Sequence, residues 1–234
     1  MTRASRLLRL QRMLAVMIEF PQARRMRRPG RSWAEIVDFA FTFGQGFLRP
    51  AQVRSEIQQA LEVIEIDQPK VVVEIGTAGG GNFFLLSRAA HSDGHLVSVD
   101  LPLGRWGDGY QAWKVPIFRR LLVKGQRSHF IRANSHDSAT VDEVKRVLQG
   151  KPVDVLFIDG DHSYEGVKED FDRYSKLVRR GGLVFFHDIV HHPAAADCHV
   201  DRLWGELRQC YESREFVENV DQGWGGIGLI RTPV

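Results

Sequence analysis

The chain has 234 residues, of which 43% are hydrophobic and 26% are charged, values that exclude disordered, collagen-like and disulfide-scaffold proteins. Cys198 and Cys210 are too few for a disulfide framework and lack the paired spacing of a zinc site, so we expect a reducing, cytoplasmic setting. No stretch approaches the ~18 consecutive apolar residues of a membrane span, and the N-terminus lacks the apolar core of a signal peptide.

The N-terminal region carries most of the excess positive charge, although the net charge of the chain is only +3. Its arginines alternate with apolar residues, which is typical of a basic amphipathic helix that contacts an anionic membrane surface or an acidic partner. The same pattern is typical of a helix that packs on its own domain. The residues concerned are Arg3, Arg6, Arg9, Arg12, Arg24, Arg25, Arg27, Arg28 and Arg31, interleaved with Leu7, Leu8, Leu10, Met13, Leu14 and Met17.

Residues 1–52 are predicted to form a helical extension, and residues 53–234 the main domain. The extension is expected to break at Pro21 and again near Pro29, because proline lacks a backbone donor and restricts the preceding residue. A second helical stretch is predicted near Trp33 to Phe43.

Strands and helices are predicted to alternate from residue 53 onward, beginning with a helix over 53–64. Near-continuous apolar strands favour a parallel sheet covered on both faces, and a short turn near the C-terminus favours an antiparallel last strand. The expected fold is therefore an α/β, Rossmann-like doubly wound sheet, mostly parallel. Thr140 and Glu143 are typical of a capping box for one of its helices. The expected strands are 71–75, 95–100, 130–133, 153–158, 183–186, 216–220 and 227–230.

Polar residues follow five of these strands at their carboxyl ends, where open parallel sheets bind their ligands. The glycine-rich run from Gly76 to Asn82 allows a tight turn and a close approach of the backbone to a ligand. Asp100 follows about twenty residues later, where a carboxylate can accept both ribose hydroxyls of an adenosine. The five polar ends are Glu74, Asp100, Asn134, Asp159 and the pair His187-Asp188.

The loop lacks the G-x-G-x-x-G spacing with which nicotinamide dinucleotide enzymes hold a pyrophosphate. Glu74 precedes the first glycine, and its charge suits a cationic ligand better than a pyrophosphate. A nicotinamide-dependent oxidoreductase is therefore disfavoured, and an adenosine cofactor of another kind is expected.

From about Lys70 to Ile230 the sequence resembles the class I S-adenosylmethionine-dependent methyltransferases. Within that class it is most similar to the branch of catechol-type and caffeoyl-type O-methyltransferases and the sugar and cephalosporin-hydroxylase-like proteins. The motifs that carry the resemblance are EIGTAGGGN from residue 74, VSVD ending at Asp100, RANSHD from 132, LFIDGDHSYEGV from 156 and GGLVFFHD from 181.

The resemblance implies S-adenosyl-L-methionine as the cofactor. The loop from Gly76 to Asn82, including Thr77 and Gly80 and preceded by Glu74, would face the methionine part. Asp100 would hold the ribose, and Asn134 and Ser135 would flank the adenine. Asp159 is expected to contact the cofactor as well and, with His162, to take part in catalysis.

The resemblance further implies a divalent metal site formed by Asp159 with His187 and Asp188, and it places His162 at the family's catalytic lysine position. A hard cation such as magnesium or manganese would lower the pKa of an acceptor hydroxyl, and His162 has a suitable intrinsic pKa to accept its proton. His187 departs from the pattern, because relatives carry an acid or amide there, and imidazole shifts the preference towards manganese. The alternative is that Asp159 and Asp161 cap the following helix and that Asp188 accepts from backbone amides.

Three further aromatic residues follow the fifth strand. His191 and His192 lie in a loop that is either solvated or overhangs the substrate, and Trp224 is expected either to line a pocket or to be buried between the last strands.

The expected function is methyl transfer to a hydroxyl of a small polyhydroxylated acceptor, such as a sugar or natural product, with metal assistance. Two alternatives remain: a partner-dependent protein like those of the cephalosporin-hydroxylase branch, and a membrane-surface or nucleic-acid-binding module that acts through the N-terminal arginines. The second predicts salt-sensitive binding. No base-recognition motif is evident, so no nucleic-acid substrate is expected, whereas a peripheral membrane contact and a homo-oligomer are compatible with the sequence.

Overall fold

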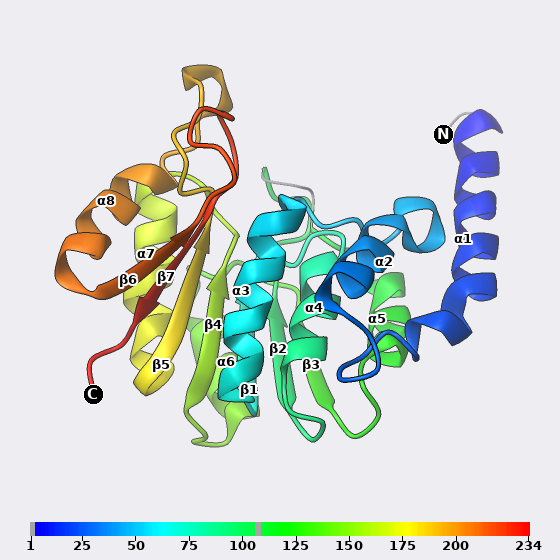
Figure 1. Cartoon of the computed structure of the whole chain (residues 1–234), viewed down its shortest axis with the longest axis horizontal. Coiled ribbons are helices and arrows are strands. Elements are labelled where there is room, and N and C mark those ends of the chain that lie inside the picture. Colours follow the sequence, from blue (N-terminus) through cyan, green and yellow to red (C-terminus); the bar gives the residue numbers. More distant parts are fainter. Residues whose placement is uncertain (1–2, 106–108) are drawn as a thin grey trace.

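The computed structural model describes residues 3–105 and 109–234, with side chains described from residue 11 onward. The described strands form one sheet in the order β3-β2-β1-β4-β5-β7-β6 (Figure 1). Their bounds are β1 Val71–Ile75, β2 His95–Val99, β3 Arg127–Ile131, β4 Val153–Ile158, β5 Val178–His187, β6 Glu212–Phe216 and β7 Ile227–Arg231. The helices are α1 Arg3–Ala23, α2 Trp33–Gly46, α3 Arg54–Asp67, α4 Gly81–Ala89, α5 Val115–Leu121, α6 Ser138–Leu148, α7 Tyr164–Tyr174 and α8 Val200–Cys210.

The strands β1 to β5 run parallel, and β7 pairs antiparallel with both β5 and β6. Parallel neighbours need a crossover connection, and the helices that follow β1, β2 and β4 supply it. The predicted Rossmann-like, mostly parallel sheet with an antiparallel end is therefore confirmed. Within the described residues, no helix has both the length and the apolarity that a membrane crossing needs.

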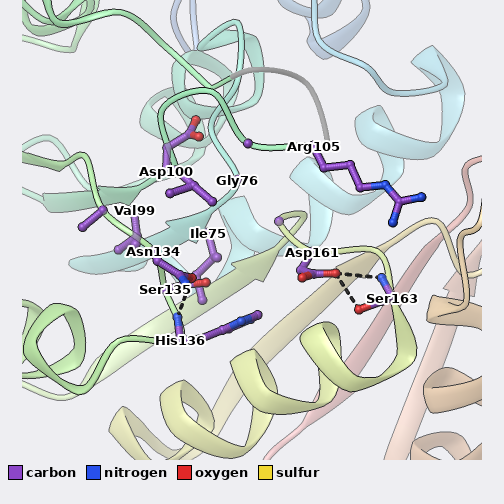
Figure 2. Close-up of a pocket in the computed structure, with 14 residues that line it drawn as sticks. Ile75, Gly76, Val99, Asp100, Arg105, Asn134, Ser135, His136, Asp161 and Ser163 are labelled. Carbon is purple, nitrogen blue, oxygen red and sulfur yellow. Dashed lines mark hydrogen bonds between the residues drawn. The ribbon is translucent and has the colours of Figure 1, made fainter.

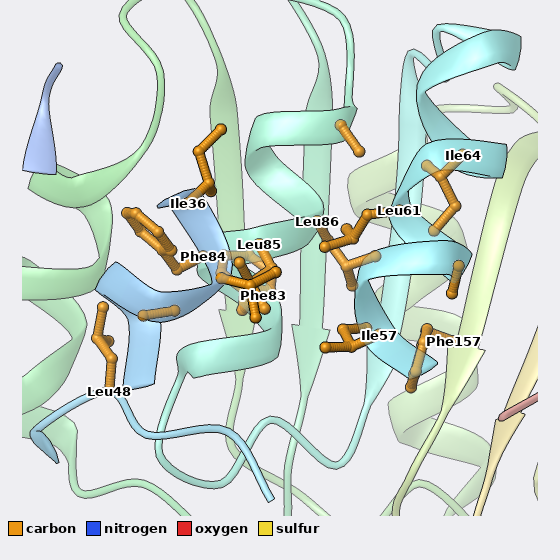
Figure 3. Packing of buried hydrophobic residues seen from close by; sticks show 14 of the residues in the cluster. Ile36, Leu48, Ile57, Leu61, Ile64, Phe83, Phe84, Leu85, Leu86 and Phe157 are labelled. Carbon is orange, nitrogen blue, oxygen red and sulfur yellow. The ribbon is translucent and has the colours of Figure 1, made fainter. Parts of the chain in front are cut away.

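Helices cover both faces of the sheet. Alternate strand residues point to opposite faces, so Val72 packs in one hydrophobic cluster while Val71 and Val73 pack in another. The first cluster contains the apolar faces of α3, α4 and α5, and Figure 3 shows Leu61 of α3 beside Leu86 of α4. The second cluster contains those of α6, α7 and α8. Burial of both faces explains why these strands are apolar almost throughout.

The N-terminal extension packs on the first face. The capping box of Ser32 and Glu35 starts α2, whose Phe39 ring lies 5.9 Å from that of Phe84 in α4. The predicted break at Pro21 is wrong, because α1 continues through it to Ala23. Proline removes one backbone hydrogen bond and its ring crowds the carbonyl four residues earlier, which α1 accommodates near its end, since the helix continues for only two residues beyond Pro21. The predicted break near Pro29 is confirmed, since turns separate α1 from α2.

Two edge strands lie earlier in the chain than predicted. The strand expected at 130–133 is β3, Arg127–Ile131, and the strand expected at 216–220 is β6, Glu212–Phe216. Edge strands tolerate polar side chains, and the exposed residues of β6 conceal it from a hydropathy pattern.

Two other local predictions also fail. The predicted capping box of Thr140 and Glu143 is wrong, because α6 begins at Ser138 with Asp137 as its N-cap. The predicted fifth strand, 183–186, extends from Val178 to His187, since pairing with β4 lengthens it. Residues 106–108 lie outside the described residues, as do the side chains of the arginines and leucines before residue 11.

Candidate active site

A cavity of about 210 Å³ opens at the carboxyl ends of β1, β2 and β4, the edge predicted to bind a ligand. Figure 2 shows the residues that line it, which come from the loops after these strands and from the turn after β3. Of the predicted cofactor residues, Gly76, Asp100, Asn134 and Ser135 line this cavity. Sequence reasoning missed His136, Arg105 and Ser163, which also line it.

The turn after β1 depends on the absence of side chains. Gly76 has φ of +86°, and a Cβ there would lie 1.8 Å from the carbonyl oxygen of Asp159. Gly80 caps α4 with φ of +86°, and its Cβ would lie 2.5 Å from the ring of Phe118. The turn therefore brings the first strand's loop against the fourth strand's loop, and both border the cavity.

Glu74 lies beneath the glycine turn and does not line the cavity. Its fully buried carboxylate accepts from Thr77 Oγ1 at 2.5 Å and from Asn82 Nδ2 at 2.9 Å. Burial raises the pKa of Glu74 to about 8, so the group is mostly neutral at pH 7. Thr77 also contacts Ser98 Oγ at 2.7 Å, which ties the turn to β2. These side chains hold the glycine turn in place.

Asp100 fixes the other side of the turn. Its Oδ2 accepts from the backbone nitrogen of Ala78 at 2.5 Å, and burial raises its pKa to about 6. The backbone amide that it binds belongs to the glycine-rich turn, so Asp100 links the turn to the cavity wall. The carboxylate lines the cavity and has the chemistry to accept hydroxyl hydrogens of a ribose.

The turn after β3 forms the third wall. Asn134 Oδ1 accepts from the backbone nitrogen of His136 at 3.1 Å, and the backbone oxygen of Ser135 accepts from Tyr174 at 2.9 Å. The ring of His136 lies 3.4 Å from Asp170, whose carboxylate raises the pKa of that histidine. These contacts fix a polar turn whose residues Asn134, Ser135 and His136 line the same cavity as Asp100.

Beyond the glycine turn lies a group that we call the histidine–aspartate cluster, formed by Asp159, His162, His187 and Asp188. His187 Nδ1 lies 3.1 Å from Asp159 Oδ1 and 3.3 Å from Asp188 Oδ2. His162 Nδ1 lies 3.0 Å from Asp188 Oδ2, and its Nε2 lies 3.6 Å from Asp159 Oδ1. The ends of β4 and β5 and the start of α7 thus bring all four predicted residues together, with each histidine between two carboxylates.

Charge pairing controls the protonation of this cluster. Burial alone would lower the pKa of both histidines, but the carboxylates outweigh it and raise the pKa of His162 to about 12 and that of His187 to about 10. Burial opposes ionisation of Asp159 and Asp188, but the histidines hold the pKa of both carboxyls below the ordinary value. At neutral pH, both imidazoles are therefore protonated on both nitrogens and cationic, and both carboxyls are ionised.

Several residues that the sequence did not single out support this cluster. Gln52, from the segment before α3, donates to Asp159 Oδ2 at 2.8 Å. The backbone nitrogen of Gly225 donates to Asp188 Oδ1 at 2.9 Å, as the alternative reading of Asp188 expected. Cys198 lies with His162 and Asp188 in a group whose ligand atoms are within 4.8 Å of one another. No periodicity in the sequence could have indicated Gln52 or Cys198.

The other residues predicted near the site differ in burial and in their contacts. His192 is buried, and its Nε2 lies 3.2 Å from Asp188 Oδ1, so it contacts the cluster directly. His191 is exposed and pairs with Asp201 at 2.8 Å. Trp224 is 44% exposed, so the expectation that it is buried between the last strands is wrong. The prediction that Asp161 caps the following helix is wrong, because Ser163 is the N-cap of α7; Asp161 instead accepts from the backbone nitrogen of Ser163 at 2.9 Å and from its hydroxyl at 2.7 Å.

The donor atoms of the cluster fit a divalent metal. One atom each from Asp159, His187 and Asp188 lies within 4.8 Å of the others, and two carboxylates with one imidazole suit manganese or a similar ion. The imidazole nitrogen that would bind the metal now faces both carboxylates, so metal and proton compete for the same place.

Part of the chain is similar to known methyltransferase domains and to two uncharacterised proteins. Residues 73–189 match a family model described as a methyltransferase domain. The chain is 34% identical over 116 residues to the uncharacterised protein R132 of Acanthamoeba polyphaga mimivirus, a match that covers 50% of each chain. It is 28% identical over 123 residues to the uncharacterised protein y4gI of Sinorhizobium fredii, covering 52% of this chain and 13% of that protein. The chain thus spans half or less of the length of these curated relatives.

Solved structures share the fold. The O-methyltransferase TomG from Streptomyces achromogenes, in complex with SAM, superposes with a TM-score of 0.55 at 19% identity, covering 87% of this chain and 91% of that one. An O-methyltransferase from Bacillus cereus in complex with SAH gives 0.54 at 17% identity, covering 88% and 93%. A putative caffeoyl-CoA O-methyltransferase from Staphylococcus aureus gives 0.57 at 16% identity, covering 95% and 99%. At these identities, the likeness concerns the fold.

Proposed function

Because the chain belongs to the methyltransferase-domain family, as the match over residues 73–189 shows, we propose that it is an O-methyltransferase that uses S-adenosyl-L-methionine. Its acceptor in this proposal is a hydroxyl of a small polyhydroxylated molecule such as a sugar or natural product. The observation that carries the proposal is the adjacency of the cavity at Asp100 to the histidine–aspartate cluster, which the close contact of Gly76 with Asp159 produces.

The cofactor assignment follows from the shape and chemistry of the cavity. Asp100 would accept from the ribose hydroxyls, and Asn134, Ser135 and His136 would surround the adenine. The methionine part would then lie along the glycine turn, with its sulfonium methyl directed towards the cluster. Two of the solved O-methyltransferases with this fold hold SAM or SAH, which supports the same cofactor here.

In the proposed reaction, the acceptor oxygen attacks the methyl carbon, the carbon–sulfur bond breaks, and S-adenosylhomocysteine leaves with the bond electrons. The hydroxyl proton must pass to a base. A divalent cation held by Asp159, His187 and Asp188 would supply a Lewis acid that lowers the pKa of the hydroxyl. Asp159 and Asp188 keep His162 protonated, and a cation bound by these carboxylates would offset their charge and lower the pKa of His162, so that its neutral imidazole would accept the hydroxyl proton.

The test separates cofactor binding from chemistry. Calorimetric titration should give micromolar binding of S-adenosyl-L-methionine to the intact chain, at least about tenfold weaker binding to Asp100→Asn, and unchanged binding to the exposed control Asp221→Asn. Failure of the intact chain to bind, or a preference for NADH, would refute the cofactor assignment.

Acceptors are then compared by mass spectrometry, with catechols, flavonoids and sugars incubated with the cofactor. Each incubation contains EDTA, magnesium or manganese. A methylated product formed only with a metal supports the metal-assisted reaction, and equal product in EDTA refutes that part of the proposal. Asp188→Asn should abolish the metal effect, because it removes one of the three donors.

A further inference from the structure

A second cavity, of about 640 Å³, lies at the amino ends of the strands, whereas the candidate active site lies at their carboxyl ends. The helix α4 runs back from the carboxyl ends of the strands, so its last turn lies near their amino ends, and residues 122–126 of the wall lead directly into β3. Figure 1 shows the end of α1 beside α5 in this region. Among the residues that the structure describes, no acidic residue lines the cavity, and its cationic residues are Arg24, Arg27, Arg88, Arg119, Arg120 and Lys124.

Arg88 forms the floor of this basic cavity and is only 6% exposed. Its Nη2 donates to the backbone oxygen of Ala23 at 3.2 Å and to that of Leu121 at 2.5 Å, which are the last residues of α1 and α5. The negative ends of two helices thus offset part of its charge. Its Nε has no hydrogen-bond partner among the described residues. Burial, together with the charge of Arg27, lowers the pKa of Arg88 to about 9.

The other cations of the cavity also have no acidic partner in the part of the chain that the structure describes. Within the described residues, none of the six takes part in an ion pair, whereas exposed arginines elsewhere, such as Arg146 with Glu143, do. Arg24 and Arg120 instead stack on Phe20, at 5.9 Å and 5.1 Å from the ring centroid. Concentrating like charges around a buried guanidinium is unfavourable unless an anion neutralises them.

We propose that the basic cavity is a binding site for a phosphoryl anion, either a soluble phosphate ester or the headgroup of an acidic phospholipid. Guanidinium groups match the oxygens of a phosphoryl group in pairs, and several of them can share one dianion. The site is independent of the proposed methyl transfer, since it lies at the amino ends of the strands and the candidate active site lies at their carboxyl ends. The apolar side chain of Met17, 69% exposed on α1, lies in the adjoining surface with Phe20 and Arg24, so the lipid source must be tested as well.

The test uses the full chain and two probes. Inorganic pyrophosphate is titrated calorimetrically at low ionic strength, and vesicles of phosphatidylcholine with or without phosphatidic acid are used for co-sedimentation. The double variant Arg119→Gln with Arg120→Gln removes two exposed cations of the wall, and Lys145→Gln with Arg146→Gln removes the same charge from exposed positions on α6. Circular dichroism and calorimetric S-adenosyl-L-methionine titration verify that each variant folds.

We expect binding of at least one probe by the intact chain, a loss of at least about tenfold in the wall variant and less than about twofold in the α6 variant. Pyrophosphate binding without vesicle binding assigns a soluble ligand, and vesicle binding that requires phosphatidic acid assigns a lipid headgroup. Absence of binding to both probes overturns the proposal. Equal losses in the two variants also overturn it, because they would indicate attraction by net charge alone.

Discussion

The buried carboxyl of Glu74 gives a sharp test of the electrostatics beneath the glycine turn. Its pKa is raised from 4.5 to about 8 on folding because burial disfavours its charged form. A raised pKa means that the folded state binds the proton more tightly, so this stabilising contribution is complete below pH 4.5 and declines as pH rises to 8. Each pH unit in that window costs up to about 1.4 kcal/mol.

The variant Glu74→Gln removes the titration and keeps the shape. Its amide oxygen can accept from Asn82, and its nitrogen can donate to Thr77, whose hydroxyl then donates to Ser98. Between pH 5 and 7.5, the free energy of unfolding of the variant should therefore rise relative to the natural chain by about 3 kcal/mol.

Urea unfolding at half-unit steps of pH measures the difference. Glu143→Gln serves as the control, because Glu143 is exposed to solvent and its pKa is lowered by Arg146, so that variant should show no such rise. Parallel curves for the natural chain and Glu74→Gln would refute the reasoning, because they would mean that Glu74 is already ionised or that the turn opens to water.

Further substitutions test the rest of the site and fold. Gly76→Ala should destabilise the fold by more than about 3 kcal/mol in urea unfolding, because the methyl would meet the carbonyl of Asp159 in a left-handed backbone; a loss below about 1 kcal/mol would contradict the contact. Phe157→Ala, in the fully buried centre of β4, should cost about 3 to 5 kcal/mol, and a smaller loss would indicate that the core collapses around it. Manganese should raise the Tm of the natural chain at pH 8 more than at pH 6, because it displaces a proton from His187; a pH-independent shift would contradict that competition.

The sequence alone determined the central part of the sheet and the edge that carries the site. Strands buried on both faces are apolar almost throughout, so β1, β2 and β4 were recognisable without a partner. Gly76 and Asp100 were recognisable for a similar local reason, since a tight turn needs positive φ and the carboxylate follows at a fixed spacing.

Only the tertiary structure decided which polar groups meet and what each one does. Glu74 lies beneath the loop because its carboxyl accepts hydrogen bonds from Thr77 and Asn82 there. A hydropathy pattern contains no information about the direction of that side chain. Each cluster histidine acquired a raised pKa from two carboxylates that arrive on separate loops. The basic cavity lies where the ends of α1, α4 and α5 meet, although these segments are far apart in the chain. Tertiary packing brings their charges together, and the electric field in the cavity depends on the distances between those charges.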